Sequence, residues 1–306
     1  MMRAITYIDT VKIEVDLNNQ SEQNQLQIEL IEYIKKLKSV RIKHTDKDIG
    51  NGRVYREYQV LFKGKQIAGI TTGIYYEGSY RLGNRRKVYY VALKLAGLKR
   101  YKELIDKASL HCLLYVCRYL NMRKIPFKLT ELDIALDINC SLKHVLALVN
   151  RRVPNVKYHE VNESQSNYST TRYIEKIEAK KVNKAVSRAY VYSKGKKAKL
   201  DYSVTRFEIK LQSKFFNCYA IDIQAIKRSV DRYTILYFQD ESHVKEYLKQ
   251  YRDGKLDLKH PKLKHRVHID IEYVEEFINM LFSINQYSTY DMLMPTRGVD
   301  YHILKK

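Results

Sequence analysis

Three carboxylates within seven residues are the side chains of this sequence best suited to chemistry. They lie in the stretch 129–139, which reads L-T-E-L-D-I-A-L-D-I-N. Its alternation predicts a β-strand, because successive strand side chains point to opposite faces. One face is apolar, and the other carries Glu131, Asp133 and Asp137. Carboxylates on one face repel each other unless a cation lies among them. The pattern therefore indicates either a divalent cation site or acids that pair with Lys and Arg across a sheet.

Two later segments also alternate as strands and could complete such a site. The polar face of the first carries Arg188, Tyr190, Tyr192 and Lys194, and that of the second carries Arg206 and Glu208. If these strands neighbour the acidic strand, one sheet face would combine a carboxylate cluster, tyrosine hydroxyls and several cations. The sequence alone does not show whether the three strands are neighbours in a sheet.

The composition points to a polyanionic partner. The chain has 306 residues with 56 Lys+Arg against 34 Asp+Glu, a formal net charge of +22. This balance favours nucleic acid, with a membrane surface as second candidate. The 27 tyrosines suit base stacking, although strand propensity accounts for most of them equally well. The 4 cysteines lack metal-ligand spacing, and we expect a cytoplasmic protein without a membrane span.

The elements that must position these residues follow an α+β order. We expect a large antiparallel β-sheet body packed with helices, followed by a more helical C-terminal part. The boundary divides residues 1–220, a mixed β/α catalytic body, from 221–306, a helical region that contacts DNA. The sequence predicts helices from about residue 22 to 38 and over 102–120, each with an apolar stripe at helical spacing. It also predicts a short helix over 142–149 and three helices beyond residue 220.

Three motifs in this order resemble a known family. The segments are L-T-E-L-D-I-A-L-D at 129–137, R-A-Y-V-Y-S-K at 188–194 and T-R-F-E-I-K-L at 205–211. They resemble strands of the Rep_trans-type rolling-circle replication initiators of small plasmids, and of related conjugative relaxases. The resemblance covers a quarter to a third of the chain. Glu131 stands where the family usually has Arg, and Ser193 where it often has an acid.

The resemblance implies a DNA nicking and strand-transfer endonuclease. In that family a tyrosine attacks a phosphodiester at a replication origin, remains on the 5′ phosphate and frees a 3′ hydroxyl. It implies Tyr192 as nucleophile with Tyr190 as rival, and Lys194 and Arg206 near the phosphate. A Mg²⁺ or Mn²⁺ ion suits hard oxygen ligands and offsets charge in the transition state. The implied ligands are Asp133, Asp137 and Glu208, with Glu131 as a neighbouring candidate.

The implied partners are DNA and the replication machinery. We expect single-stranded or cruciform origin DNA, host helicase and polymerase, and a homodimer, all by resemblance. The basic residues that we expect to contact DNA are Arg188, Lys196, Lys197, Lys199, Lys262, Lys264 and Arg266. A cluster of this kind gives an affinity that falls steeply with salt.

Two other function classes remain open. A non-catalytic nucleic-acid-binding protein would use the same basic and aromatic surface, but it leaves the acidic strand face unexplained. A metal-dependent nuclease that uses water would need the carboxylates and no tyrosine adduct. A tyrosine recombinase fits less well, because the chain lacks a convincing Arg…His-x-x-Arg…Tyr series.

Overall fold

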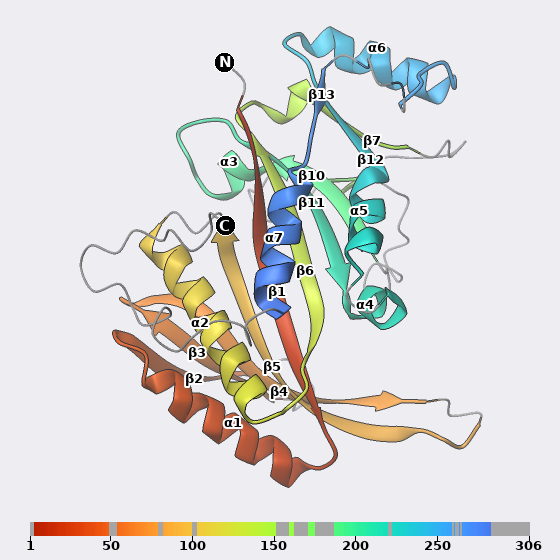
Figure 1. Cartoon of the computed structure of the whole chain (residues 1–306). Helices are drawn as coiled ribbons and strands as arrows, with labels where there is room; N and C mark the ends of the chain where they lie inside the picture. Colours follow the sequence, from red (N-terminus) through yellow and green to blue (C-terminus); the bar gives the residue numbers. More distant parts are fainter. Residues whose placement is uncertain are drawn as a thin grey trace. The chain divides into compact units, whose positions relative to one another are not determined.

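The fold is described from a computed structural model of the chain (Figure 1). The residues that it describes are 3–48, 54–78, 82–99, 103–150, 159–161, 171–174, 187–219, 222–258, 260, 263 and 265–282. They fold into two compact units whose segments alternate along the chain. Unit 1 consists of the described residues within 1–14, 94–102 and 128–278, and unit 2 of those within 15–93, 103–127 and 279–306. Strands β1 (Ala4–Leu17) and β5 (Arg86–Lys99) contribute residues to both units.

Unit 1 contains the acidic strand and most of the smaller elements. Its strands, with most of β1, are β6 (Lys128–Ile138), β7 (Val145–Val149), β8 (His159–Val161), β9 (Thr171–Tyr173), β10 (Ser187–Ser193), β11 (Thr205–Gln212), β12 (Tyr233–Tyr237) and β13 (Arg266–Val267). Its helices are η1 (Leu142–His144), α3 (Lys194–Lys197), α4 (Ser213–Tyr219), α5 (Ile223–Asp231), α6 (Glu241–Arg252) and most of α7 (Ile271–Phe282).

The main sheet of unit 1 runs in the order β1-β6-β11-β10-β9-β8. Strand β6 pairs antiparallel with β1 on one side and with β11 on the other, and β11 pairs antiparallel with β10. The apolar face of β6 is buried, with Leu132, Ile134 and Ile138 each fully covered. Burial of that face fixes the register, because a slip of one residue would turn the acids into the core.

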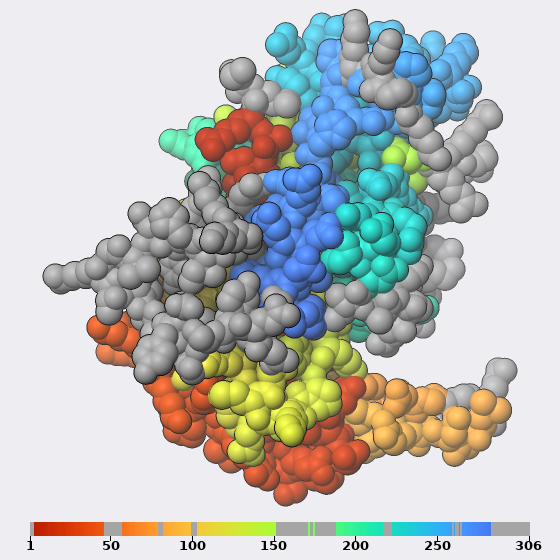
Figure 2. Space-filling view, in the orientation of Figure 1, coloured from red at the N-terminus to blue at the C-terminus, as the bar shows by residue number. Residues whose placement is uncertain are grey.

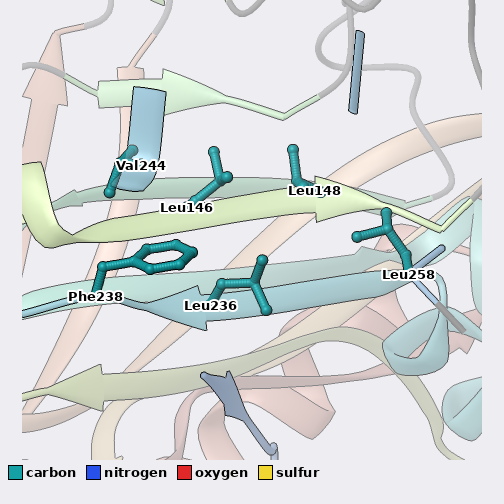
Figure 3. Packing of buried hydrophobic residues seen from close by; sticks show 6 residues of the cluster. All are labelled: Leu146, Leu148, Leu236, Phe238, Val244 and Leu258. Carbon is teal, nitrogen blue, oxygen red and sulfur yellow. The ribbon is translucent and has the colours of Figure 1, made fainter. Parts of the chain in front are cut away.

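A second sheet in unit 1 has the order β13-β12-β7. A cluster of buried apolar residues joins β7, β12, α6 and the segment that follows α6 (Figure 3). Its members are Leu146, Leu148, Leu236, Phe238, Val244 and Leu258. This cluster gives helix α6 an apolar surface against which to pack.

Unit 2 combines two helices with the strand order β2-β3-β4-β5. Its elements, with most of β5, are α1 (Gln20–Lys35), β2 (Val40–Asp48), β3 (Val54–Phe62), β4 (Lys65–Glu77) and α2 (Leu104–Met122). Helix α1 begins at Asn19, whose side chain accepts a hydrogen bond from the backbone N–H of Glu22 at 2.9 Å, as an N-cap does. Helices α1 and α2 contact each other through stacked Tyr33 and Tyr115, whose ring centroids are 4.1 Å apart.

The predicted α+β class with a large antiparallel sheet is confirmed. The predicted helix over 142–149 is wrong, because residues 145–149 form the buried strand β7 after one 3₁₀ turn. The prediction also missed β12, which lies between the helices α5 and α6 beyond residue 220. The functional division at residue 220 stays a prediction, while the two compact units have the bounds given above. No helix of the described residues is both long and apolar enough to span a membrane.

Candidate active site

The three strands that carry the sequence motifs are neighbours in unit 1, in the order β6-β11-β10. Residues that pair directly across antiparallel strands share a face of the sheet. Arg206 lies opposite Asp137 and Tyr192, and Glu208 lies opposite Ala135 and Tyr190. The three strands are therefore neighbours, and their polar residues lie on one face of the sheet. We call this the polar face of the sheet, formed by Glu131, Asp133, Asp137, Tyr190, Tyr192, Lys194, Arg206, Glu208 and Lys210.

Asp137 is held by two cations. Arg206 donates to it through Nε at 2.6 Å and through a terminal nitrogen at 2.9 Å, and Lys194 Nζ lies 2.8 Å from Oδ2. Burial alone would raise the pKa of Asp137, but the hydrogen bonds from Arg206 hold it below its usual value. Arg206 also contacts Asp9 of β1 at 2.5 Å and is only 2% exposed. Asp137 and Arg206 thus form a buried, bidentate ion pair, the strongest geometry available to these groups.

Asp133 lies at the other end of the polar face in a different environment. Its Oδ2 accepts a hydrogen bond from Lys210 at 3.1 Å, whereas its buried Oδ1 has no hydrogen-bond partner among the described residues. Burial raises the pKa of Asp133 to about 7, although Lys210 opposes that shift. Lys210 also contacts Glu131 at 2.5 Å, and Glu131 has a further cation, Lys94, at 3.0 Å. Asp133 is therefore a buried carboxylate with one cation in contact and one oxygen without a hydrogen-bond partner among the described residues.

Glu208 connects the two tyrosines. Its Oε1 accepts a short hydrogen bond from the Tyr190 hydroxyl, and its Oε2 accepts one from the Tyr192 hydroxyl at 3.2 Å. Burial raises the pKa of Glu208, and the hydrogen bond from Tyr190 opposes this shift. Burial, followed by the charge of Glu208, also raises the pKa of both phenols. Glu208 therefore orients both hydroxyls and is placed to accept a phenolic proton.

Two features distinguish the environments of the tyrosines. Arg206 acts against the rise in the pKa of Tyr192, and Lys197 Nζ lies 5.0 Å from the centroid of its ring. For Tyr190, burial, the charge and hydrogen bond of Glu208, the charge of Asp133 and the neighbouring Tyr192 all raise the pKa. The phenolate of Tyr192 is thus better supported by positive charge, which agrees with its predicted priority as nucleophile. Which tyrosine reacts stays a prediction.

The predicted metal ligands fit a divalent cation only in part. Asp133 fits, because its buried Oδ1 has a free lone pair. Glu208 is its diagonal neighbour across the strand pair, but both Glu208 oxygens accept hydrogen bonds from tyrosine hydroxyls, so Glu208 fits only when a tyrosine releases it. Asp137 does not fit in this arrangement, because Arg206 and Lys194 occupy both of its oxygens. Among the described residues, no group of three or more His, Cys, Asp or Glu side chains is arranged to hold a metal. Mg²⁺ commonly uses one or two carboxylates together with substrate phosphates. A Mg²⁺ or Mn²⁺ requirement, with Asp133 and Glu208 as its carboxylates, stays a prediction.

The predicted DNA-contacting residues fall into three groups. Lys196, Lys197 and Lys199 are exposed on α3 and just beyond it, immediately after the polar face. Arg188 lies on β10 opposite Lys210 and is half-buried, and Arg266 donates to the backbone carbonyl of Leu258. Lys262 and Lys264 lie outside the described residues. Contact with DNA stays a prediction for all of them.

Asp9 and Lys210 belong to the network but were not among the candidates drawn from the sequence. Lys210 has the same strand parity as Arg206 and Glu208, which was a usable signal. Asp9 was harder to find, because the register between β1 and β6 shifts between Ile8 and Thr10. Such a bulge turns the strand faces over at that point. A strict alternation read along β1 therefore assigns the residues on one side of Asp9 to the wrong face.

Comparison with known proteins gives likenesses to solved structures and no sequence match. No family model matches the chain, and no curated protein sequence matches it. A solved structure of a rolling circle replication initiator protein from Geobacillus stearothermophilus resembles it with a TM-score of 0.37 and 12% identity. That likeness covers 82% of this chain and 97% of the other. At this TM-score no residue correspondence follows, so residue roles rest on the geometry of this chain.

Proposed function

We propose that this chain is a DNA nicking and strand-transfer enzyme of the rolling-circle initiator type. One observation supports the proposal above all: β6, β11 and β10 are adjacent, and their motif residues share one buried polar face. Surface ion pairs on a solvated sheet would leave these side chains accessible. Here Asp133, Arg206 and Glu208 are 2%, 2% and 4% exposed. Burying charged groups costs desolvation free energy. Clusters of buried titratable groups with shifted pKa values are typical of functional sites.

The proposed nucleophile is the hydroxyl of Tyr192. Glu208 accepts its proton, and the phenolate oxygen forms a bond to the phosphorus of the scissile phosphodiester. The bond from phosphorus to the 3′ oxygen breaks, and that oxygen takes a proton from water. The products are a 5′-phosphotyrosine link and a free 3′ hydroxyl. Attack by that hydroxyl on the link reverses the step, so the same groups perform strand transfer.

Cations next to Tyr192 would stabilise the charge on the phosphate. The side chain of Lys194 is 24% exposed, and its Nζ lies beside Asp137. From this edge of the polar face, Nζ can reach toward a bound phosphate. Lys197 is exposed and close to the Tyr192 ring. Arg206 acts in this proposal as a positioning residue, because its guanidinium is engaged by Asp137 and Asp9. Such positive groups act where charge develops in the transition state.

Asp133 would hold a Mg²⁺ or Mn²⁺ ion, and Glu208 offers the second carboxylate when a tyrosine does not engage it. When bound there, the ion supplies Lewis acidity toward a phosphate oxygen. The ion would also favour the ionised form of Asp133, whose pKa burial raises to about 7. The net charge of +22 is consistent with DNA as the substrate. An origin in single-stranded or cruciform form, a host helicase and polymerase, and a homodimer belong to this proposal as well.

A nicking assay tests the proposal. The purified chain is incubated with supercoiled DNA of the replicon that encodes it, with and without Mn²⁺ or Mg²⁺. We expect metal-dependent nicked circles that carry protein on the 5′ end. Tyr192→Phe should remove the adduct, while Tyr190→Phe, the matched control two residues away on the same strand face, should retain it.

Each other outcome rejects a defined part of the proposal. An adduct that survives in Tyr192→Phe and disappears in Tyr190→Phe reverses the choice of nucleophile. Nicked circles without any adduct favour a nuclease that uses water. DNA binding without cleavage at every metal concentration favours a non-catalytic binding protein.

A further inference from the structure

The hairpin formed by the ends of β4 and β5 in unit 2 carries rings and cations on one side. We call residues 73–78 and 85–90 the arm. Figure 1 shows its orange strands extending beyond α1 and α2 of the same unit, and Figure 2 shows side chains of the arm accessible along its length. Residues 79–81, which lie outside the described ranges, are not part of the arm as defined here.

Contacts across the arm define its register. Arg86 pairs with Glu77 at 3.0 Å, and the Tyr90 ring lies against the backbone of Gly73. Gly73, Glu77, Arg86 and Tyr90 therefore share one side, together with Val88, which is 2% exposed. Since strand side chains alternate, the neighbouring residues occupy the opposite side. That opposite side, which we call the outer side, consists of Ile74, Tyr76, Arg85, Lys87 and Tyr89.

The outer side combines exposed apolar groups with cations. Ile74 is 46% exposed and Tyr76 is 55% exposed. The Arg85 guanidinium lies 4.1 Å from the centroid of the Tyr76 ring, and Lys87 Nζ lies 4.7 Å from that of Tyr89. The described residues of this side include no acidic side chain. Cations over accessible rings, without a compensating carboxylate, form a surface that is complementary to a polyanion with flat apolar groups.

We propose that the outer side of the arm binds single-stranded DNA, with bases stacked on Tyr76 and phosphates held by Arg85 and Lys87. Stacking on aromatic rings combined with cationic contacts to the backbone is how sequence-independent single-strand sites work. A duplex keeps its base faces stacked inside, and so it leaves Tyr76 and Ile74 without partners. The inference extends beyond the nicking chemistry and does not depend on it, because the arm shares no residue with the polar face of unit 1.

Binding to a labelled oligothymidine, followed by fluorescence anisotropy in EDTA, tests the inference without cleavage. Tyr76→Ala should weaken binding about tenfold, within the range for loss of one stacked base, whereas Tyr76→Phe should retain it. Arg85→Gln should lower the slope of log affinity against log salt by about 0.7, the value for one contact to a single strand, and adding Lys87→Gln should bring the decrease to about 1.4. Arg86→Gln is the matched control, because it removes the same charge from the inner side of the arm.

Circular dichroism and thermal melting verify that each variant is folded. The proposal is overturned if Tyr76→Ala binds oligothymidine as tightly as the unaltered chain, or if Arg86→Gln reduces the salt slope as much as Arg85→Gln. It is also overturned if the variants lose more affinity for a duplex of equal length than for the single strand. A loss confined to vesicles of phosphatidylserine and phosphatidylcholine would assign the arm to a lipid surface instead.

Discussion

Asp133 and Asp137 lie on the same face of the same strand, yet their replacement by Asn should change stability in opposite directions. Burial raises the pKa of Asp133 from 3.8 to about 7, whereas Arg206 holds the pKa of Asp137 below 3.8 against the effect of burial. A raised carboxyl pKa means that the native state binds a proton that the unfolded state has released. The contribution of Asp133 to the free energy of unfolding therefore falls as pH rises from about 4 to about 7, and it is constant above pH 7.

The magnitude follows from these pKa values. A change from 3.8 to about 7 corresponds to about 4 kcal/mol at pH 8, and little discount for solvent applies because the side chain is 3% exposed. Asp133→Asn resembles the protonated form, so it should stabilise the protein at pH 8 by up to about 4 kcal/mol. Asp137→Asn should cost about 3 kcal/mol, because it removes one partner of a buried ion pair and leaves Arg206 with Asp9.

Urea denaturation at a series of pH values from 4.5 to 8 provides the measurement. The difference between each variant and the unaltered chain is taken at every pH, so that titration of the other groups cancels. For Asp133→Asn the stabilisation should grow with pH up to about 7 and then remain constant. The reasoning is refuted if Asp133→Asn is less stable than the unaltered chain at pH 8, or if its difference does not change with pH.

Three further predictions concern the same region. Mn²⁺ should raise the thermal midpoint of the unaltered chain at pH 8 and leave that of Asp133→Asn unchanged in differential scanning fluorimetry; an equal rise in both would exclude Asp133 as a ligand. Lys210→Met should lower the free energy of unfolding by about 3 kcal/mol at pH 8, because Lys210 is the one described cation in contact with Asp133. The loss should be smaller at pH 5, where Asp133 is neutral. An equal loss at both pH values in urea denaturation would contradict this. Gly195→Ala should cost about 2 kcal/mol by overpacking, because its Cβ would lie 2.6 Å from the backbone oxygen of Tyr202; an unchanged unfolding midpoint would show that this turn can relax.

The sequence predicts the acidic strand and its partners well, for a physical reason. In β6 and β11 one face is apolar and the other is mostly polar, so apolar and polar residues alternate and the polar residues are read directly from the pattern. The predicted helix over 142–149 failed because V-L-A-L-V at 145–149 is buried on both sides and has no period that separates strand from helix. Its partner β12 is a short apolar strand between two helices, and its pairing depends on contacts distant in sequence.

Most members of the polar face were predictable from the sequence, but their pairing was not. Alternation identifies Asp133 and Asp137 as equivalent members of one face. It cannot show that Arg206 lies opposite Asp137 while Lys210 lies opposite Asp133, because that depends on the register between strands about 70 residues apart in sequence. This register is what makes Asp137 an ion-pair partner and leaves Asp133 Oδ1 without a hydrogen-bond partner among the described residues. Two acids with the same pattern thus acquire opposite pKa shifts.

Identification of the residue that becomes attached to DNA tests the central claim most directly. After reaction with the DNA of its own replicon and Mn²⁺, the protein is digested with trypsin and with nuclease, and the peptides are analysed by mass spectrometry. Trypsin cleaves after Arg188 and after Lys194, so one peptide, A-Y-V-Y-S-K, contains both candidate tyrosines. We predict a nucleotide on this peptide, and fragmentation should locate it on Tyr192. Nicked DNA together with an unmodified peptide, or a nucleotide on any other peptide, would contradict the account.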